Sequence, residues 1–529
     1  MDLHGKNLIG NSLSGEGDKT FTSFNPREGR PLETTFHEAS SAELHRAIDL
    51  ATHAAVEMRA LDAAQIAEFL LAIRDELLGL GDALTEMADR ETALGLDRLR
   101  GERDRTTNQI KLFADIVREG SWVDARIDPA IPDRKPLPRP DIRRMLQPIG
   151  PIAVFGASNF PLAFSVAGGD TASAFASRNP VVVKAHPAHP GISELAGVAI
   201  QRAAQVTRMP EGTFSLLHGR APETSIALAT HPHIRAVAFT GSLRAGRALF
   251  DAAARRPEPI PVFAEMSSVN PVIILPKILE SGARTISEGL YRSVTLGVGQ
   301  FCTSPGLVFA AESGALHEFV GQLGTLFAEG TPGTMLNPGI CQNFAERFKA
   351  AAAIGGVEAK VSTRSAEPKH TEGQPGLLVT KAPVWLKQHE LHEEIFGPST
   401  LVVRCASPRE LAACAEKLEG TLTASIHGTP DELAANKELV DVLSRKAGRL
   451  IFNGFPTGVE VGYAMHHGGP YPATTDEKFT SVGAAAIYRF ARPICYQNFP
   501  ENLLPPELQN ANPRKIWRMI SGQLTRDAV

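Results

Sequence analysis

A chain of 529 residues, of which 43% are hydrophobic and 21% charged, is too long for one hydrophobic core, so we expect two or three globular domains. The formal net charge of -4 gives no reason to expect a nucleic acid or an anionic membrane as a partner. Five scattered cysteines without a C-x-x-C pair, no secretory signal and no apolar run of about 18 residues predict a cytoplasmic protein with free thiols.

The first 120 residues are predicted to be largely helical. Alanine and leucine recur at helical spacing in four segments, which are 42–58, 64–80, 83–93 and 103–118. Residues 121–147 then change character, because their proline-rich runs disfavour helix. We interpret this segment as a linker or an extended arm.

From residue 150, short apolar runs alternate with helical stretches. The predicted strands are 152–155, 181–183, 214–217, 236–239 and 260–263, and the predicted helices are 193–206, 223–229 and 244–255. This alternation predicts βαβ units around a parallel sheet. A second α/β region follows from 271 to about 470. The tail from about residue 484, with residues 486–490 and then Arg492 and Pro493, is predicted to pair as a strand with the 121–147 arm, and residues 500–529 are expected to wrap the surface.

Cys302 is the first candidate catalytic residue. It lies in the string Gly-Val-Gly-Gln-Phe-Cys-Thr-Ser-Pro-Gly at 297–306, whose glycines and proline predict a break in regular structure with backbone N–H groups facing a ligand. A thiol in such a turn can be activated against a carbonyl carbon, whereas a cysteine elsewhere is usually a small buried apolar residue. We therefore interpret Cys302 as a nucleophile.

A carboxylate and an amide would complete a site for covalent catalysis. Glu265 follows an apolar run, at a strand end where open parallel sheets place ligand contacts, and could act as a general base on the thiol or on water. Asn159, in Ser-Asn-Phe-Pro at 158–161, could donate its amide N–H to an oxyanion together with the backbone N–H of Cys302. A solvated strand-end glutamate and a turn asparagine are the alternatives.

Five short motifs occur in one order along the chain. They are Asn-Phe-Pro at 159–161, Val-Val-Lys at 182–184, Phe-Thr-Gly-Ser at 239–242, Gly-Gln-Phe-Cys at 299–302 and Glu-Glu-Ile-Phe-Gly-Pro at 393–398. Each is weak alone, but together they resemble the aldehyde dehydrogenase superfamily over nearly the whole chain. The resemblance implies that Cys302 is the nucleophile, Glu265 the general base and Asn159 the oxyanion donor.

The same resemblance implies a fold of the α/β class, aldehyde dehydrogenase-like, in three parts. These are a Rossmann-type dinucleotide-binding domain (1–120 and 148–265), an α/β catalytic domain (266–475) and a β oligomerisation arm with the C-terminal tail (121–147 and 480–529). An oligomerisation arm implies a homodimer or a homotetramer.

Cofactor contacts are carried over position by position from the resemblance. Lys184 would reach the adenosine ribose, Gly241 and Ser242 would bring a pyrophosphate to a helix N-terminus, and Glu394 and Phe396 would hold the nicotinamide ribose and ring. The full set of predicted cofactor contacts is Phe155, Ala157, Ser158, Lys184, His186, Pro187, Phe239, Gly241, Ser242, Glu394 and Phe396.

The residues after Lys184 bear on the choice of cofactor. Many relatives that prefer NAD carry a glutamate three positions after this lysine, where Pro187 stands here, so no carboxylate would repel a 2′-phosphate. Lys184, His186 and Arg220 could attract one, and we therefore predict NADP, with NAD possible. No metal is expected, since His186 and His189 precede prolines on a loop and the pair His466-His467 is interpreted as part of a packed loop.

Departures from the common pattern narrow the resemblance to a branch of the superfamily. Glu-Met-Ser-Ser at 265–268, Ser158 before Asn-Phe-Pro, and Arg-Pro-Ile-Cys-Tyr-Gln at 492–497 resemble the 2-oxoglutarate semialdehyde (2,5-dioxopentanoate) dehydrogenases. This implies oxidation of that aldehyde to 2-oxoglutarate through a Cys302 thioester. A long-chain fatty aldehyde is the alternative substrate, and a binding protein of this fold without turnover is the alternative of another class.

A dioxo acid is best held by a cation that faces its carboxylate. Arg292, ten residues before Cys302 on a predicted helix, and Arg105, on the helix predicted at 103–118, are the candidates, and a surface position is the alternative for both. Aromatic side chains at Phe160, Phe164 and Phe455 are candidate walls of the substrate tunnel, with core packing as their alternative.

Overall fold

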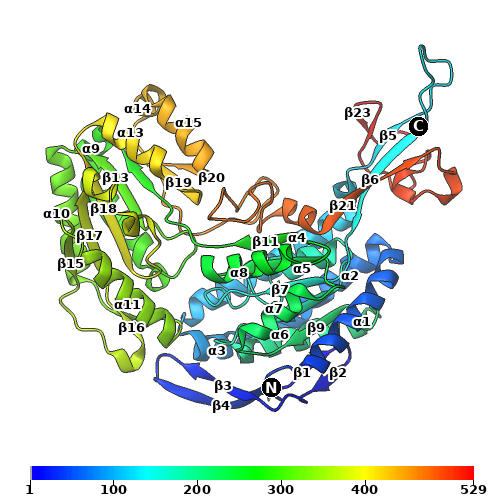
Figure 1. Ribbon diagram of the computed structural model, residues 1–529, viewed down its shortest axis with the longest axis horizontal. Helices are drawn as coiled ribbons and strands as arrows, with labels where there is room; N and C mark the ends of the chain where they lie inside the picture. The colour runs from blue at the N-terminus through cyan, green and yellow to red at the C-terminus, as the bar shows by residue number, and fades with distance from the viewer. Residues whose placement is uncertain (1–2) are drawn as a thin grey trace.

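The computed structural model describes residues 3–529 (Figure 1). Two α/β lobes lie side by side, and a narrow β arm projects from the one that contains the N-terminal half of the chain. Among the described residues, no helix is both long and apolar enough to cross a bilayer. No individual helix or strand was predicted before residue 42, whereas the structure has four strands there.

The first lobe is built on a seven-stranded sheet. Its strands, in spatial order, are β11 (Val262–Glu265), β10 (Ala236–Thr240), β7 (Ile152–Phe155), β8 (Val181–Lys184), β9 (Phe214–Leu217), β1 (Asn7–Ile9) and β2 (Ser12–Ser14). The strands from β7 to β11 pair in parallel, and β1 adds to the edge in the antiparallel sense. All five strands predicted in this region are therefore confirmed, within one or two residues.

The order of these strands creates a switch point. The chain runs from β7 outward to β8 and β9, then returns to the other side of β7 to form β10 and β11. The connections diverge at the carboxyl ends of β7 and β10, and open parallel sheets bind ligands in the crevice outside such a point. Phe155 and Glu265 end β7 and β11 at this edge of the sheet.

Helices cover both faces of this sheet. They are α1 (Ser41–Ala60), α2 (Ala63–Gly79), α3 (Gly81–Thr92), α4 (Leu96–Glu119), α5 (Gly169–Ala176), α6 (Pro190–Val206), α7 (Pro222–Thr230) and α8 (Leu243–Ala254). Capping boxes start α1 and α2, because Ser40 with Glu43 and Asp62 with Gln65 satisfy first-turn N–H groups. The apolar faces of α2, α4 and α6 meet in one core. The four helices predicted before residue 121 are all present.

The second lobe holds another seven-stranded sheet. Its strands, in spatial order, are β15 (Glu358–Val361), β17 (Gly376–Lys381), β18 (Ser399–Cys405), β13 (Leu307–Ala311), β12 (Val272–Ile274), β19 (Thr421–His427) and β20 (Ala447–Phe452). Around it lie α9 (Pro276–Thr295), α10 (Gly314–Glu329), α11 (Pro338–Ala352), α12 (Ala382–Trp385), α13 (Pro408–Lys417), α14 (Pro430–Ala435) and α15 (Lys437–Lys446). Two apolar cores fill the two faces, as expected for a buried parallel sheet.

The projecting arm is a five-stranded sheet of segments from two distant parts of the chain. Its strands, in spatial order, are β21 (Ala491–Gln497), β6 (Ile142–Pro148), β5 (Arg126–Asp128), β22 (Arg518–Ile520) and β23 (Gln523–Thr525). Smaller two-stranded sheets pair β3 (Thr20–Asn25) with β4 (Arg30–His37), and β14 (Gly333–Thr334) with β16 (Glu372–Gly373). The tail thus adds strands to the arm as well as covering the surface.

The tail strand predicted to pair with the arm is present, but its predicted start is wrong. Residues 486–490 belong to the 3-10 helix η5 (Ala484–Phe490), and the strand that pairs with β6 begins only at Ala491. The segment is helical because Ala486, Ile487 and Phe490 all bury their side chains in the core of the first lobe, which an alternating strand cannot do.

Candidate active site

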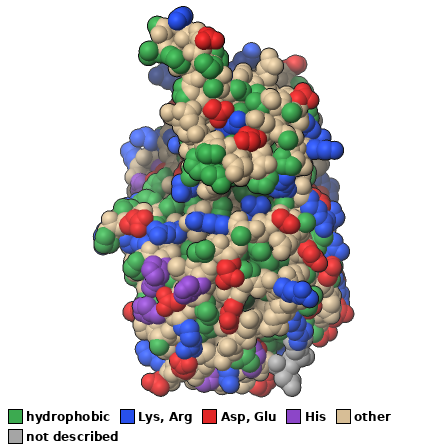
Figure 2. Space-filling model, turned by 90° about the vertical axis from the view of Figure 1, so that its right-hand side faces the viewer, with side chains coloured by type: hydrophobic (Ala, Val, Ile, Leu, Met, Phe, Trp, Pro, Cys, Tyr) green, Lys and Arg blue, Asp and Glu red, His purple; other side chains and the backbone are tan. Residues whose placement is uncertain are grey.

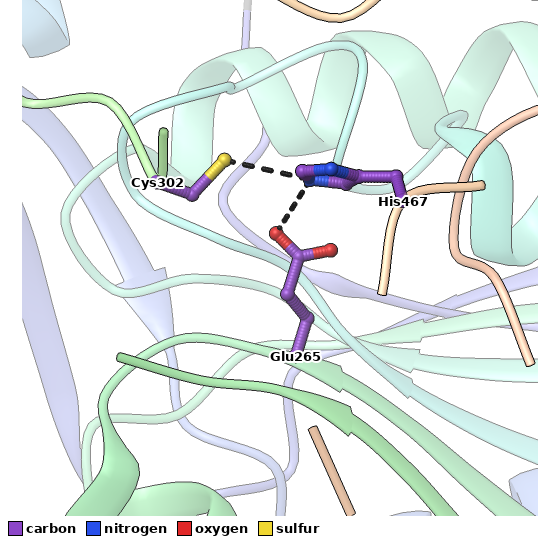
Figure 3. A group of neighbouring side chains, drawn as sticks. All are labelled: Glu265, Cys302 and His467. Carbon is purple, nitrogen blue, oxygen red and sulfur yellow. Dashed lines mark hydrogen bonds and ion pairs between the residues drawn. The ribbon is translucent and has the colours of Figure 1, made fainter. Parts of the chain in front are cut away.

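Three side chains from distant parts of the chain meet between the two lobes (Figure 3). The Sγ atom of Cys302 lies 3.6 Å from Nε2 of His467, and the same Nε2 lies 3.0 Å from Oε1 of Glu265. The side chains of Glu265 and His467 are only 3% and 1% exposed. A thiol, an imidazole and a carboxylate within hydrogen-bonding reach are the parts of an activated nucleophile.

The segment 464–482 supplies two of the contacts of Glu265. It returns to the edge of the first sheet, where Met266 N donates to Ala473 O at 2.8 Å and Glu265 forms an isolated bridge with Thr474. This path brings in His467 and also Ser481, whose hydroxyl donates to Oε2 of Glu265 at 2.5 Å. Both carboxylate oxygens therefore have a partner.

The turn that carries Cys302 is held by close backbone contacts. Gly299 has φ +68°, and a Cβ atom there would lie 2.1 Å from the carbonyl oxygen of Gly397, so only glycine fits. Asn270 donates through Nδ2 to the carbonyl oxygens of Cys302 at 2.8 Å and of Ser304 at 3.0 Å. These contacts fix the backbone from which the thiol projects.

Burial and the charge of Glu265 raise the pKa of the Cys302 thiol well above its ordinary value, and the charge of Arg105 opposes them. Burial would also raise the pKa of Glu265, but the charge and hydrogen bond of His467 and the hydroxyl of Ser481 outweigh it and hold that pKa below its ordinary value. The resting arrangement is thus a protonated thiol beside an ionised carboxylate, with an imidazole nitrogen between them.

Asn159 lies against the nucleophile turn. Its side-chain Nδ2 donates to the backbone carbonyl oxygen of Gln300 at 2.9 Å. Its backbone carbonyl oxygen accepts from Arg98 Nη2 at 2.7 Å. An amide nitrogen carries two protons, so one N–H remains for an oxyanion.

Comparisons with known proteins identify the family. The aldehyde dehydrogenase family model matches residues 13–473. The chain belongs to the aldehyde dehydrogenase family.

Two similar proteins cover almost the whole chain. The alpha-ketoglutaric semialdehyde dehydrogenase 2 of Azospirillum brasilense is 48% identical over 99% of this chain and 100% of its own length. The alpha-ketoglutaric semialdehyde dehydrogenase of Acinetobacter baylyi is 42% identical over 99% of both. The crystal structure of lactaldehyde dehydrogenase from Escherichia coli superposes with a TM-score of 0.80 at 20% identity, covering 93% of this chain and 98% of that one, which shows a shared fold.

One face of α4 in this aldehyde dehydrogenase points at the nucleophile turn. Arg98, Glu102 and Arg105 are spaced so that they share a helix face. Glu102 accepts from the backbone N–H groups of Leu162 and Ala163 at 2.9 and 3.0 Å, and so ties α4 to the segment after Asn159.

Three arginines place positive charge around Cys302. Arg98, Arg105 and Arg449 each have a pKa that burial lowers and that the charge of Cys302 raises. Each also has one buried N–H nitrogen without a hydrogen-bond partner among the described residues. Arg105 and Arg449 donate to neighbouring carbonyls, of Val459 at 3.3 Å and Gly458 at 3.2 Å, and Arg105 lies on the wall of an open cavity of about 610 Å³.

The predicted substrate contacts separate into two groups. Phe164 lies 6.2 Å, centroid to centroid, from the ring of His467, and Phe160 packs on Phe164 and on Phe301, so both line the site. By contrast, Phe455 packs against His427 on the second sheet. The structure does not bring Arg292 to the site either, because its side chain is 78% exposed and pairs with Glu288 on α9.

The predicted cofactor contacts cluster at the switch point of the first sheet. Phe155 and Phe239, at the ends of β7 and β10, have ring centroids 6.5 Å apart, and Ala157 and Ser158 follow β7 directly. Ser242 caps α8, and Gly241 before it is exposed. The N-terminus of α8 is therefore open to an anion, and the residues present fit a dinucleotide.

Lys184 ends β8 and is 8% exposed. Burial lowers its pKa to about 8, and the charge of Glu38 opposes this shift. Glu38 is a carboxylate that the sequence argument on the cofactor did not consider. His186 and Pro187 follow on a partly buried loop, where the His186 ring stacks on His189 at 5.2 Å.

Glu394 provides a second carboxylate near the thiol, and Phe396 lies partly buried two residues later. Burial raises the pKa of Glu394 to about 7, although the hydroxyl of Ser267 and the backbone N–H of Ser268 both bond to it. Its charge is one of those that raise the pKa of Cys302.

Sequence reasoning missed the roles of His467, Ser481, Arg98 and Arg449. His467 was assigned to a packed loop; it is buried in one, but its Nε2 contacts both Cys302 and Glu265. It lies 165 residues from Cys302 and 202 from Glu265, so no local spacing could have predicted these contacts. The only local signal was a histidine pair before two glycines.

Proposed function

We propose that this chain oxidises 2-oxoglutarate semialdehyde to 2-oxoglutarate, with a thioester on Cys302 as the covalent intermediate. The observation that carries the proposal is the contact of Cys302, His467 and Glu265 at the carboxyl edge of the first sheet. The charges of Arg98, Arg105 and Arg449 act on this group. The relatives at 48% and 42% identity, named for the same aldehyde, support this substrate.

In this proposal, Glu265 accepts the thiol proton as Cys302 attacks the aldehyde carbon. Nε2–H of His467 donates to Oε1 of this carboxylate at 3.0 Å and holds it in place. The free N–H of Asn159 and the backbone N–H of Cys302 donate to the oxyanion, and such a donor contributes about 2.7–4 kcal/mol in other acyl-transfer sites. Glu265 releases the first proton to solvent and, after oxidation, takes a proton from the water that cleaves the thioester.

A bound nicotinamide dinucleotide supplies the hydride acceptor for this oxidation. Gly241 and Ser242 at the start of α8 would hold its pyrophosphate, Lys184 its adenosine ribose, and Glu394 with Phe396 its nicotinamide end. We propose that NADP is preferred and NAD tolerated, because Pro187 stands where many relatives that prefer NAD carry a carboxylate. Lys184 ends β8, and the exposed Arg220 follows β9, so both could attract a 2′-phosphate. Glu38 opposes this preference, so Glu38→Gln should strengthen it.

The arginines favour a dioxo acid over the alternative of a long-chain aldehyde. An apolar tunnel without an arginine near the thiol would suit a fatty chain, whereas here the charges of Arg98, Arg105 and Arg449 act on Cys302. We assign the substrate carboxylate to Arg105, since its Nη1 is buried without a partner among the described residues and its guanidinium lies 5.3 Å from the centroid of Phe164.

We propose that residues 1–120 and 148–265 bind the cofactor, that residues 266–475 carry out catalysis, and that residues 121–147 and 480–529 form the oligomerisation arm and tail. Residues 1–2 lie outside the described part. Large apolar side chains on and beside the arm support a homodimer or a homotetramer (Figure 2). Among them, Leu137, Leu503 and Leu524 are 69%, 63% and 64% exposed. A cytoplasmic location stays a prediction that the five free cysteines support.

The test is an initial-rate panel with each cofactor. We expect kcat/KM for 2-oxoglutarate semialdehyde to exceed that for uncharged aldehydes of similar length by about 10–100-fold, the value of one charge-assisted hydrogen bond. A higher kcat/KM for a long-chain aldehyde would replace the substrate assignment. The absence of cofactor reduction with every aldehyde would favour the binding protein without turnover.

A further inference from the structure

The group of Cys302, His467 and Glu265 offers three different ligand atoms to one point. Sγ, Nε2 and a carboxylate oxygen all lie within 4.8 Å of one another, and no other such group of three occurs among the described residues. Thiolate sulfur, imidazole nitrogen and carboxylate oxygen are the atoms that Zn²⁺ binds in proteins. No metal site was predicted from the sequence, because His466 and His467 were interpreted as part of a packed loop.

Two of the three separations are close to those around a tetrahedral ion. Zinc–ligand bonds of about 2.3 Å to sulfur and about 2.0–2.1 Å to nitrogen and oxygen set the ligand atoms about 3.3–3.6 Å apart. The observed separations are 3.6 Å from Cys302 Sγ to His467 Nε2 and 3.0 Å from that Nε2 to Glu265 Oε1. The sulfur and a carboxylate oxygen lie within 4.8 Å of each other, and Figure 3 shows the thiol and the carboxylate both directed at the same imidazole nitrogen.

Neighbouring residues hold the ligand atoms in place, and the ligands themselves can neutralise the charge of the ion. Ser481 fixes the second oxygen of Glu265 at 2.5 Å, and Asn270 fixes the backbone of Cys302 at 2.8 Å. A thiolate and a carboxylate neutralise a divalent ion, which matters in a buried site. The charges of Arg98, Arg105 and Arg449 oppose a cation here and weaken its binding, without removing the ligand set.

We propose that Cys302, His467 and Glu265 bind one Zn²⁺ ion, and that this ion inhibits the enzyme reversibly. The sulfur lone pair that would attack the aldehyde forms the bond to zinc, and the thiol proton passes to solvent. His467 binds the ion through Nε2 with its ring proton on Nδ1, and the lone pair of Glu265 that would accept a proton is likewise used. The binding stands on the geometry alone, whereas the inhibition rests on the proposed function.

Cobalt is the spectroscopic probe for this site. The metal-free full-length chain is titrated with Co²⁺, then with Zn²⁺ as competitor. We expect a thiolate-to-cobalt charge-transfer band and the intense visible bands of a four-coordinate ion in the parent. The thiolate band should be absent in Cys302→Ser, a near-isosteric change that keeps the test valid if other variants fold poorly. We expect His467→Phe to weaken the metal affinity by at least about 100-fold, and Ser481→Ala by about 10-fold.

A surface cluster provides the matched control. The ring of His231 lies 5.2 Å from that of His45 and 5.3 Å from that of His233, and histidines gather on one face of the molecule (Figure 2). Cys495 is an exposed free thiol. The double variant His231→Ala, Cys495→Ser should keep the cobalt spectrum, the metal affinity and the aldehyde activity of the parent.

The outcomes separate this proposal from the proposed function. A cobalt spectrum that survives Cys302→Ser and is lost in the surface double variant means an adventitious metal only, and overturns the site. The metal site is also overturned if the parent shows no thiolate-to-cobalt band and its aldehyde oxidation is insensitive to Zn²⁺. That outcome leaves the proposed function standing. A parent that binds cobalt as described but oxidises no aldehyde keeps the site and removes the proposed function.

Discussion

Glu265 and Glu394 are two carboxylates whose charges both act on Cys302, yet their environments push their pKa values in opposite directions. Burial would raise both. Around Glu265, the imidazole of His467 and the hydroxyl of Ser481 outweigh burial and lower the pKa. Around Glu394, the hydrogen bonds from Ser267 and Ser268 do not outweigh burial, and the pKa of this carboxylate is raised to about 7. The contacts of each carboxylate therefore decide which one is ionised and ready to accept a proton at neutral pH.

The same contrast explains why the Cys302 thiol stays protonated at rest. Burial and the negative charge of Glu265 hold Cys302 protonated at rest, so the nucleophile is formed only when a base accepts its proton. The ionised Glu265 is placed for this step, and Nε2–H of His467 orients it. A thiol kept protonated between turnovers is also less open to oxidation and alkylation.

The largest effect is expected at the nucleophile itself, which both carboxylates serve. Cys302→Ala should abolish aldehyde oxidation and keep cofactor binding, because no other described sulfur lies in this group. Stopped-flow absorbance of the reduced cofactor measures the first, and calorimetric titration with the cofactor measures the second. Turnover near the parent rate would remove Cys302 from the mechanism.

Glu265→Gln should separate the two functions of the charge. Loss of the general base lowers kcat by about 10²–10⁴-fold. Loss of the negative charge also lowers the pKa of Cys302, so alkylation by iodoacetamide at neutral pH should become faster while turnover falls. An alkylation rate at or below that of the parent would show that Glu265 does not control the thiol.

His467→Phe removes the group that holds the pKa of Glu265 down. The pKa of Glu265 should then rise. As the pH falls, the base therefore becomes protonated, and kcat/KM is lost, at a higher pH than in the parent. We expect a loss of about 10²-fold at neutral pH, the low end of what general-base catalysis contributes, because Glu265 is no longer oriented and ionised. A merely structural role would lower the rate without moving the acidic limb of the pH profile.

Arg105→Met tests the cationic side of the site. The KM for 2-oxoglutarate semialdehyde should rise by about 10–100-fold, because one charge-assisted hydrogen bond to the carboxylate is lost. An uncharged aldehyde should be unaffected. Arg292→Met is the matched control, since that side chain is exposed and paired with Glu288, and it should change neither KM. Equal effects of Arg105→Met on both aldehydes would contradict the assignment.

The smallest effect is expected at the second carboxylate. With a pKa of about 7, Glu394 is largely protonated at pH 6, where Glu394→Gln should change kcat/KM by less than about threefold. The difference should grow above pH 8, where only the parent carries the charge. A pH-independent effect as large as that of Glu265→Gln would show that the two carboxylates do not differ as described.

Much of this site could be predicted from the sequence, because parallel strands end at a common edge. The apolar run before Glu265 and the motif at Cys302 placed a carboxylate and a thiol where they are found. Contacts made by a returning loop could not be predicted. His467 and Ser481 reach Glu265 from 202 and 216 residues away, and only the path of residues 464–482 along β11 brings them there.

The late start of the tail strand has a related cause. Residues 486–490 are apolar enough for a strand, but their burial in the core of the first lobe favours a 3-10 turn and moves the strand to Ala491. Arg292 was placed near the site by its distance along the chain from Cys302, whereas the turn of α9 points it to solvent. Sequence distance to a nucleophile says little about the face of a helix.

Mass spectrometry of Glu265→Gln, quenched during turnover of 2-oxoglutarate semialdehyde with NADP, tests the central claim most directly. With water activation impaired, the acyl group should accumulate as a thioester on the peptide that contains Cys302, and hydroxylamine should release it. An acyl adduct on any other residue, or continued cofactor reduction with Cys302 unmodified, would contradict the account.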